Sequence, residues 1–347
     1  MNKRFFVLLL SFQLISGYSY SQYIEKYPLL PAVRSSFRGL SVVNDSVAWV
    51  SGSKGWVGRT TNRGLHWEFN QVPGYETLDF RSLYAFNDST ALIANAGSPA
   101  YILRTTNCGK SWQAVYTNTA AEIFIDGVDF WNKLEGVMYG DPIDGHMFLL
   151  FTKDGGKTWH EPALETRPKL NEGEASFAAS STGIRCYDKK RLVIATGGKT
   201  SRLFISDNRG KTWSNATPPA QQGKESAGIF SVAFQSSKAG VVVGGDFAID
   251  SLKIRNAFYT NDSGKTWKEA ERVPSGYREC VEYLSVNTLV TTGPTGTEYS
   301  TDGGKHWLPL SDEKGFHAVR KARTGNWIVI AGNNALGLVS LQPKAKK

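Results

Sequence analysis

Three arginines occupy one recurring sequence context that suits the binding of an anion. Arg38, Arg81 and Arg278 each follow an aromatic residue, in the stretches FRG, FRS and YRE. A guanidinium group is a rigid fork of donors that matches a carboxylate or a phosphate. His317 follows an aromatic residue in the same way, in FHA. If the fold brings these side chains together, they form a site for an anionic ligand or an acidic peptide terminus.

Four acidic residues are candidates for the same site, where they would orient the ligand: Asp126, Asp141, Glu174 and Asp246. Two carboxylates flanking a sugar also carry out glycoside hydrolysis, and Asp141 with Asp246 is the pair that this enzymatic alternative would use. A structural alternative stands beside both. In it, the arginines pair with Asp126, Asp141 or Glu279 and brace neighbouring elements of the fold.

Signals for metal or cofactor chemistry are weak. The stretch DPIDGH offers Asp141, Asp144 and His146 as metal ligands, but an Asp-Gly pair between two apolar runs is more typical of a hairpin turn. The three cysteines lack the spacing of a zinc site, and the sequence contains no dinucleotide-binding or Ser-His-Asp signature. We therefore expect no metal and no cofactor, and no catalytic residues unless the glycosidase alternative holds.

The elements that position these residues follow from a turn that recurs six times. Each copy has Ser or Thr, then Asp or Asn two residues later, Gly two residues after that, and Trp three residues further on. The Asp or Asn oxygen can accept from backbone N–H groups, and the glycine can take the positive φ of a tight turn. The spacing fits neither a phosphate loop nor a calcium loop. The Asp or Asn residues are Asn62, Asn107, Asp154, Asn208, Asp262 and Asp302, and the tryptophans, expected between neighbouring sheets, are Trp67, Trp112, Trp159, Trp213, Trp267 and Trp307.

The tryptophans of these turns lie 40 to 54 residues apart, in or near the repeat range of four-stranded propeller blades. Three short apolar strands precede each turn, and a seventh set of strands at the C-terminus lacks a fourth strand, which residues 23–32 can supply. We therefore predict an all-β, seven-bladed β-propeller over residues 22–341, with its ring closed by the N-terminal strand. The expected starts of the seven first strands are Phe37, Phe80, Phe124, Phe177, Phe230, Tyr277 and Phe316.

The repeated turn also predicts which residues share a face of the disc. It joins the third and fourth strands of a blade, so it marks one face. Because successive strands run in opposite directions, the starts of the first strands and the ends of the second strands open on the other face. This arrangement places Arg38, Arg81, Arg278 and His317 around one mouth of the channel and brings the acidic candidates to the same level.

The turn S/T-x-D-x-G-x-T-W resembles the Asp-box, or bacterial neuraminidase repeat, of sialidases, some endoglucanases and sortilin-like receptors. The stretches FRGLSVVNDSVAWVSGSKGWVGRTTNRGLHW and FRSLYAFNDSTALIANAGSPAYILRTTNCGKSW are similar to repeats of the photosystem II stability/assembly factor family and its non-photosynthetic bacterial relatives. This resemblance implies a seven-bladed propeller and, in the photosynthetic members, an assembly role rather than an enzyme. A sialidase is disfavoured, because SFRG stands where a sialidase-like FRIP would begin and lacks its Ile-Pro.

The N-terminus has the pattern of an export signal. Two basic residues precede an apolar run over residues 5–15, and Ser-Tyr-Ser at 19–21 fits a cleavage site. The apolar run is too short to cross a bilayer. We predict a signal peptide at 1–21, a basic tail at 342–347, and export to the periplasm or the exterior with no membrane span after the leader is removed.

The charge of the chain gives little support to nucleic-acid binding. The formal net charge is +9 at pH 7, but five of the cations lie in the leader and the tail. We expect an exported, monomeric, non-catalytic binding or assembly propeller that presents its charged mouth to an anionic protein segment or glycan. The alternative is a secreted glycoside hydrolase that uses the same mouth.

Overall fold

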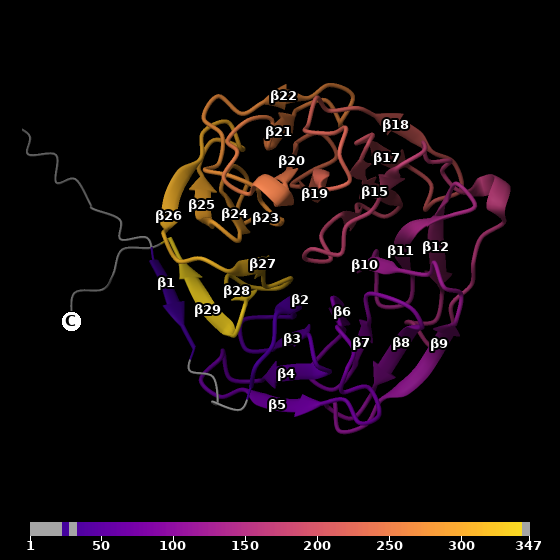
Figure 1. The fold of residues 1–347 in the computed structure, drawn as a ribbon. Coiled ribbons are helices and arrows are strands. Elements are labelled where there is room, and N and C mark those ends of the chain that lie inside the picture. Colours follow the sequence, from indigo (N-terminus) through magenta and orange to yellow (C-terminus); the bar gives the residue numbers. More distant parts are fainter. Residues whose placement is uncertain (1–22, 28–32, 342–347) are drawn as a thin grey trace, which may run out of the picture.

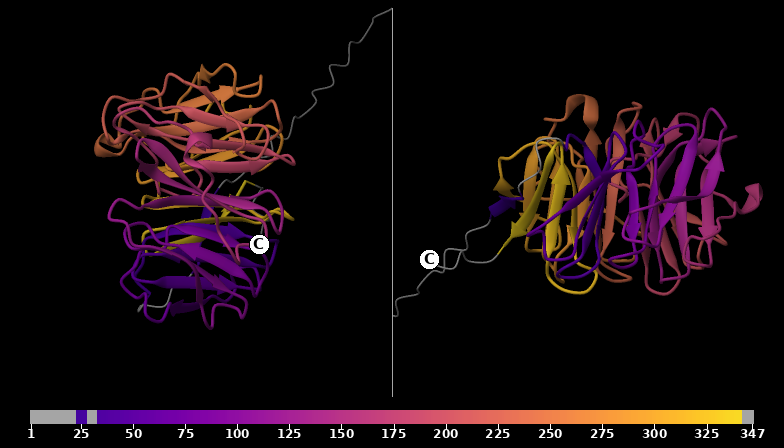
Figure 2. Two further views of the ribbon diagram at one scale, coloured as in Figure 1. Left: turned by 90° about the vertical axis from the view of Figure 1, so that its right-hand side faces the viewer. Right: turned by 90° about the horizontal axis from the view of Figure 1, so that it is seen from below.

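The computed structural model describes residues 23–27 and 33–341, so the predicted leader and basic tail lie outside the described residues. Seven antiparallel sheets surround a central channel, which confirms the predicted seven-bladed β-propeller (Figure 1). Seen edge-on in Figure 2, the molecule is a disc whose strands run between its two faces. Both helices of the described residues, η1 (Leu164–Thr166) and η2 (Phe247–Ile249), are single 3-10 turns, and neither has the length or apolar character of a membrane span.

The first three blades follow one another from the N-terminal side. Blade three has only three regular strands, and its fourth position is reduced to isolated bridges, including Phe151 with His160. Blade one contains β2 (Phe37–Val42), β3 (Ala48–Gly52), β4 (Trp56–Thr60) and β5 (Glu68–Gln71); blade two contains β6 (Ser82–Ala85), β7 (Ala91–Ala94), β8 (Ala100–Thr105) and β9 (Gln113–Asn118); blade three contains β10 (Ile125–Phe130), β11 (Gly136–Ile143) and β12 (His146–Thr152).

Blades four to six complete the ring up to its closing sheet. The short strands β13 (Glu174–Ala175) and β16 (Gly197–Gly198) extend the sheet of blade five. Blade four contains β14 (Ile184–Tyr187), β15 (Arg191–Ala195), β17 (Leu203–Ser206) and β18 (Ser214–Ala216); blade five contains β19 (Ala227–Phe234), β20 (Gly240–Asp246), β21 (Ala257–Thr260) and β22 (Lys268–Glu269); blade six contains β23 (Cys280–Tyr283), β24 (Leu289–Gly293), β25 (Gly296–Ser300) and β26 (Leu308–Ser311).

Blade seven is built from both ends of the chain, as predicted. β27 (Phe316–Lys321), β28 (Ile328–Gly332) and β29 (Ala335–Ser340) supply three strands, and β1 (Tyr23–Lys26) pairs with β29 as the fourth (Figure 1). Tyr27 follows β1 and accepts a hydrogen bond of 3.0 Å from the Trp327 indole, and its ring packs on Trp67. The N-terminal strand is therefore held by aromatic contacts as well as by its ladder.

The repeated turns have the hydrogen bonds that the sequence predicts. In blade three, the Thr152 hydroxyl accepts from Gly156 N at 2.9 Å, and the Asp154 carboxylate accepts from Thr158 N at 3.0 Å. The six glycines of the turns all have φ between 75° and 91°. Each turn lies beside the hairpin that joins the first two strands of its blade. In blade three, for example, Gly155 N donates a hydrogen bond to Leu134 O. The turns and the starts of the first strands are therefore on opposite faces.

The tryptophans of the turns pack between neighbouring blades, but not all of their indole N–H groups are satisfied. Trp159 belongs to a core cluster that joins blades two and three, and Trp67 to one that joins blades seven and one. Trp213 and Trp267 donate to the glycine carbonyl of their own turn. The indole nitrogens of Trp67, Trp159 and Trp307 have no hydrogen-bond partner among the described residues.

The expected start of blade four at Phe177 is wrong, because its first strand begins at Ile184. Residues 176–183, which we call the channel plug, project into the channel instead and are almost wholly buried (Figure 1). The plug contacts distant blades through small residues: Ala179 O accepts from Arg38 in blade one at 2.8 Å, and the Ser180 hydroxyl donates to Glu279 O before β23 at 2.7 Å. Small side chains let this backbone fill the channel, and cross-channel bonds satisfy its polar groups.

Candidate ligand-binding site in the central channel

Bulges in the innermost strands aim three of the predicted mouth residues into the channel. The register between the first and second strands shifts between Phe37 and Gly39, between Ile125 and Gly127, and between Phe316 and Ala318. The extra residue of each bulge is Arg38, Asp126 or His317. A β-bulge redirects a side chain, and this explains why residues next to the leading aromatic reach the channel.

Arg38 and His317 meet at Glu279, which had been considered only as a bracing acid. Arg38 Nη1 lies 3.0 Å from Glu279 Oε2, and His317 Nδ1 lies 2.6 Å from the same oxygen. Both side chains of the Glu279–His317 pair are about 5% exposed or less. Burial raises the pKa of Glu279, but Arg38 and His317 outweigh this effect and bring the pKa below its usual value. This cluster joins blades one, six and seven beneath the plug.

Arg278 does not join the other arginines, so the expected ring of three does not form. Its side chain is fully buried, and its Nε donates to Glu298 Oε2 at 2.6 Å. The remaining donors bond Tyr277 O, Thr295 and Ser275 within blade six. Arg278 therefore has the structural role that the sequence left open as an alternative, because its contacts hold parts of blade six together.

Arg81 and Asp126 lie near each other in the channel, and Asp126 is unusual because it is a buried carboxyl group without a partner. Arg81 pairs with Asp79 at 2.7 Å and keeps about a third of its side chain exposed. Asp126 is fully buried, and neither carboxylate oxygen has a hydrogen-bond partner among the described residues. Burial, with the nearby Asp141 carboxylate, raises the pKa of Asp126 well above its ordinary value, and Arg81 only partly opposes this.

We expect Asp126→Asn to stabilise the protein at pH 7 by about 1–2 kcal/mol, because a buried carboxyl group without partners must either keep its proton at pH 7 or be buried as a charge, and both cost free energy that an amide does not. The native state binds this proton more tightly than the unfolded chain, so wild-type stability falls as the pH rises from roughly 3.9 through the raised pKa. The advantage of the variant should therefore vanish near pH 4. Denaturant unfolding at several pH values measures the difference in the free energy of unfolding between the two proteins. Equal stability of the wild type and the variant at pH 7 would contradict the prediction.

The other predicted acids are occupied by local structure. Asp141 Oδ1 accepts from Ser176 N in the plug at 2.9 Å. Glu174 is buried against Arg202, with Nη2 at 2.5 Å from Oε2. Asp246 caps η2 by accepting from Ala248 N at 2.9 Å, and it pairs with Lys224 at 3.4 Å. No contact joins Asp141 to Asp246 among the interactions of the described residues.

The DPIDGH stretch forms a hairpin, as its Asp-Gly pair predicts. Asp144 has a φ of 52° and Gly145 a φ of 70°, so both central residues take the positive φ of the favoured two-residue turn between β11 and β12. His146 Nδ1 lies 2.9 Å from Asp144 O. The described residues contain no group of three or more His, Cys, Asp or Glu side chains that could hold a metal ion.

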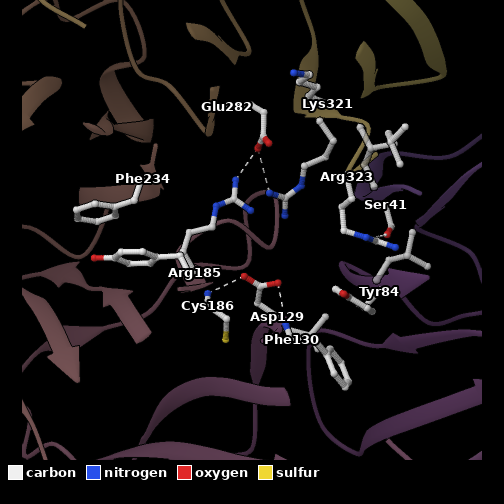
Figure 3. Close-up of a pocket in the computed structure, with 16 residues that line it drawn as sticks. Ser41, Tyr84, Asp129, Phe130, Arg185, Cys186, Phe234, Glu282, Lys321 and Arg323 are labelled. Atoms are coloured by element: carbon white, nitrogen blue, oxygen red, sulfur yellow. Dashed lines mark hydrogen bonds and ion pairs between the residues drawn. The ribbon is translucent and has the colours of Figure 1, made fainter. Parts of the chain in front are cut away.

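A pocket of about 260 Å³ lies on the other side of the plug, at the end of the channel that faces the Asp-box turns (Figure 3). We call it the cationic pocket, because four basic side chains and only two acidic ones line it. It is formed mainly by the ends of the first strands. Its charged residues are Asp129, Arg185, Glu282, Arg320, Lys321 and Arg323.

Two arginines of the cationic pocket converge on one carboxylate. Arg185 Nη2 lies 2.7 Å from Glu282 Oε2 (Figure 3). Arg320 Nη1 lies 3.4 Å from the same oxygen. Burial raises the pKa of Glu282, and Arg185 only partly lowers it. The other Glu282 oxygen accepts no hydrogen bond from these arginines. Two guanidinium groups in fixed positions therefore bind one carboxylate, which is the chemistry of an anion site.

The remaining charged groups of the pocket are held in place by the blades. Arg323 donates to the Ser41 hydroxyl at 3.0 Å, and its guanidinium lies 4.6 Å from the Tyr84 ring centroid. Lys321 Nζ donates to Leu284 O at 2.7 Å. Asp129 accepts from Cys186 N at 2.7 Å (Figure 3), and burial raises its pKa. The cations are thus preorganised before any ligand arrives.

Sequence reasoning missed this pocket because it considered only the starts of the first strands. Arg185 is the second residue of β14, which begins seven residues after the predicted start at Phe177. The signal that could have found the pocket is the run RKAR at 320–323, which puts three basic residues at the end of one inner strand. Such a run at a channel end favours an electrostatic role over a solvated face.

Comparison with known proteins supports the fold and the resemblance. The family model described as Sortilin, neurotensin receptor 3 (Sortilin-Vps10) matches residues 147–280, from β12 of blade three through blades four and five. The photosystem II assembly protein Ycf48 of Synechococcus sp. (strain JA-2-3B'a(2-13)) is 24% identical over 287 residues, covering 73% of this chain and 80% of that protein. The resemblance to this assembly factor, predicted from the repeats, is confirmed.

Solved structures extend the likeness to the whole ring. The structure described as YCF48 bound to D1 peptide superposes with a TM-score of 0.65 at 14% identity and covers 94% of this chain and 97% of that one. The GH74 xyloglucanase from Xanthomonas campestris has a TM-score of 0.64 at 15% identity and covers 94% and 55%, respectively. The chain is thus similar in sequence to Ycf48, and it shares the propeller fold both with Ycf48 and with a glycoside hydrolase.

Proposed function

We propose that this protein is an exported, non-catalytic binding propeller whose cationic pocket captures the terminal carboxylate of a protein segment. The observation that carries the proposal is the convergence of Arg185 and Arg320 on the single carboxylate of Glu282. A second carboxylate entering this pocket would meet donors already held in position. A related propeller, YCF48, is described as bound to a D1 peptide, which supports a protein segment as the ligand.

The mechanism is rigid presentation of charge. Four cations face two acids in the pocket, so an entering carboxylate gains electrostatic energy without requiring the blades to move. Arg185 is anchored by its Nε bond to Val232 O at 3.0 Å, and Arg320 by its bond to Ser181 O in the plug at 3.3 Å. The volume of about 260 Å³ suits the last residue or two of a chain rather than a folded domain.

The opposite mouth, where Arg38, Arg81, Arg278 and His317 were expected to bind the anion, remains a second surface to be tested. Of its three arginines, Arg81 is the most exposed. A binding role for this mouth stays a prediction, as do export and the monomeric state. A binding test therefore needs variants at both ends of the channel.

The test uses hexapeptides with uncharged side chains, a fluorophore on the amino terminus and a free C-terminal carboxylate. Arg185→Gln with Arg320→Gln should weaken binding by roughly 10- to 100-fold, because each removes a charge-assisted hydrogen bond. Amidation of the peptide terminus should have a similar effect. Arg81→Gln is the matched control and should leave affinity unchanged.

The opposite result would relocate the site. If Arg81→Gln abolished binding and the double variant did not, the ligand would occupy the predicted mouth. Turnover of a glycan panel that disappears in Asp141→Asn or Asp246→Asn would replace the binding function with the glycosidase alternative.

A further inference from the structure

A groove of about 880 Å³ separates blades three and four on the Asp-box side of the disc. Its origin is the irregular outer edge of blade three. After Trp159, the chain bonds to β12 only at its two ends, through the bridges Phe151–His160 and His146–Lys169. Between these bridges it leaves the sheet and forms η1. Pro162 and Pro168 lie in this segment, and because proline lacks an N–H donor, a regular fourth strand cannot form there.

The groove has an apolar floor. Trp131 and Phe151 lie parallel, with ring centroids 6.5 Å apart and an interplanar angle of 5°. Both rings are only partly buried, and Pro162 and Ala163 from the displaced segment provide further apolar surface. This floor is fixed, because the Trp131 indole donates to Arg191 O at 2.8 Å. The Arg209 guanidinium lies 5.9 Å from the Trp131 ring centroid, so an apolar side chain would share the Trp131 ring with this cation.

The rim of the groove is strongly basic. Its four lysines are exposed, and none of them forms an ion pair with a described residue: Lys153, Lys189, Lys190 and Lys211. The one acid that lines the groove, Glu135, is already paired with Arg209. Among the nearby acids, Asp154 closes its own turn and Asp207 pairs with Arg191 at 2.9 Å. The exposed Asp188 and Glu165 form no ion pair with a described residue, so the four lysines outnumber the free acids by two.

We propose that this groove binds an acidic peptide segment that carries an apolar residue among its carboxylates. The apolar side chain would pack on Trp131 and Phe151, while the carboxylates would meet the lysines. The cations surround a compact hollow and do not follow a stripe along the surface, so they match a short acidic segment better than a nucleic-acid backbone. This site is separate from the cationic pocket and does not depend on it.

The test uses the full chain and an acetylated, amidated hexapeptide of Glu and Asp around a central Phe, so that no terminal carboxylate is available to the cationic pocket. Replacing Lys189, Lys190 and Lys211 with Gln should weaken binding by about tenfold or more at moderate salt. The matched control replaces Lys110, Lys238 and Lys265. Lys110 and Lys265 stand in the turns of blades two and five where Lys211 stands in blade four, and Lys238 O accepts from Ser263 N as Lys190 O accepts from Arg209 N.

Three outcomes decide the proposal. Selective loss in the groove variant, together with loss when the peptide's Phe is changed to Gln, supports it. Equal loss in the control variant would mean unspecific attraction to a basic protein and would overturn it. Equal binding of a single-stranded oligonucleotide, weakened by the same three substitutions, would assign the groove to nucleic acid. Arg185→Gln with Arg320→Gln should leave the hexapeptide affinity unchanged, which separates this result from the proposed function.

Discussion

Replacing Arg278 with alanine should lower the free energy of unfolding by about 3–5 kcal/mol, the cost of leaving a buried charge without its partner. The Arg278 guanidinium is fully buried, and Glu298 is only 4% exposed. Arg278 also donates to Tyr277 O at 2.7 Å and to the Thr295 hydroxyl at 2.8 Å. Its removal therefore leaves the Glu298 carboxylate without its cation and takes a donor from three further oxygens, those of Tyr277, Thr295 and Ser275.

Two controls separate this pairing effect from general damage to the blade. The double change Arg278→Met with Glu298→Leu should recover most of the loss, because apolar residues of similar volume often replace a buried ion pair at little cost. Arg81→Ala, at an arginine whose ion pair is partly exposed, should cost less than about 1 kcal/mol. Urea unfolding followed by tryptophan fluorescence measures all three. If Arg278→Ala lowered the free energy of unfolding by less than about 1 kcal/mol, the ion pair with Glu298 would contribute little to stability.

Replacing Glu279 with alanine should have an effect of the same size, about 3–5 kcal/mol at pH 7, because two basic side chains lose their shared acceptor. Glu279 Oε2 is the partner of both Arg38 and His317, and it lies in a region that is buried under the channel plug. Arg38 also bonds Ala179 O, so the loss should loosen the plug. Hydrogen exchange of the plug amides should accelerate in this variant.

The pH dependence of the Glu279 cluster has a definite sign. Because the folded-state pKa of Glu279 lies below its usual value, its contribution is complete above roughly pH 4.3 and is lost as the pH falls through the folded value. Glu279→Gln should remove this acid-sensitive part of the stability curve. Asp126 has the opposite slope over the neighbouring range, so the two variants should change the curve in opposite directions. Parallel curves for wild type and Glu279→Gln below pH 4.3 would count against the pairing.

The repeats were sufficient to predict the scaffold. Each repeated turn depends on local chemistry, because its hydroxyl, its carboxylate or amide and its glycine interact within eight residues. The structure has the predicted hydrogen bonds, for example among Thr152, Asp154 and Gly156. The missing fourth strand of blade seven predicted the pairing of β1 with β29, because an open ring leaves unpaired strand edges. Alternation of strands likewise predicted that the turns and the first-strand starts lie on opposite faces.

The placement of individual charges depended on contacts that the repeats do not encode. Arg38, Arg81 and Arg278 have the same sequence context, yet one crosses the channel to the plug, one stays near the surface with Asp79, and one is buried with Glu298. The pairs of Arg38 and Arg278 are largely buried, so losing a partner there costs several kcal/mol, whereas the partly exposed pair of Arg81 contributes less.

The repeats by themselves determined the number of blades, the closure of the ring and the face on which each turn lies, since these follow from local turns and strand direction. Only the tertiary structure decided that residues 176–183 fill the channel and that Arg185 and Arg320 meet at Glu282. These groups lie far apart in the chain, and packing at the ring centre brings them together. Side-chain pairing there is set by distance and burial, which no pattern along the chain specifies.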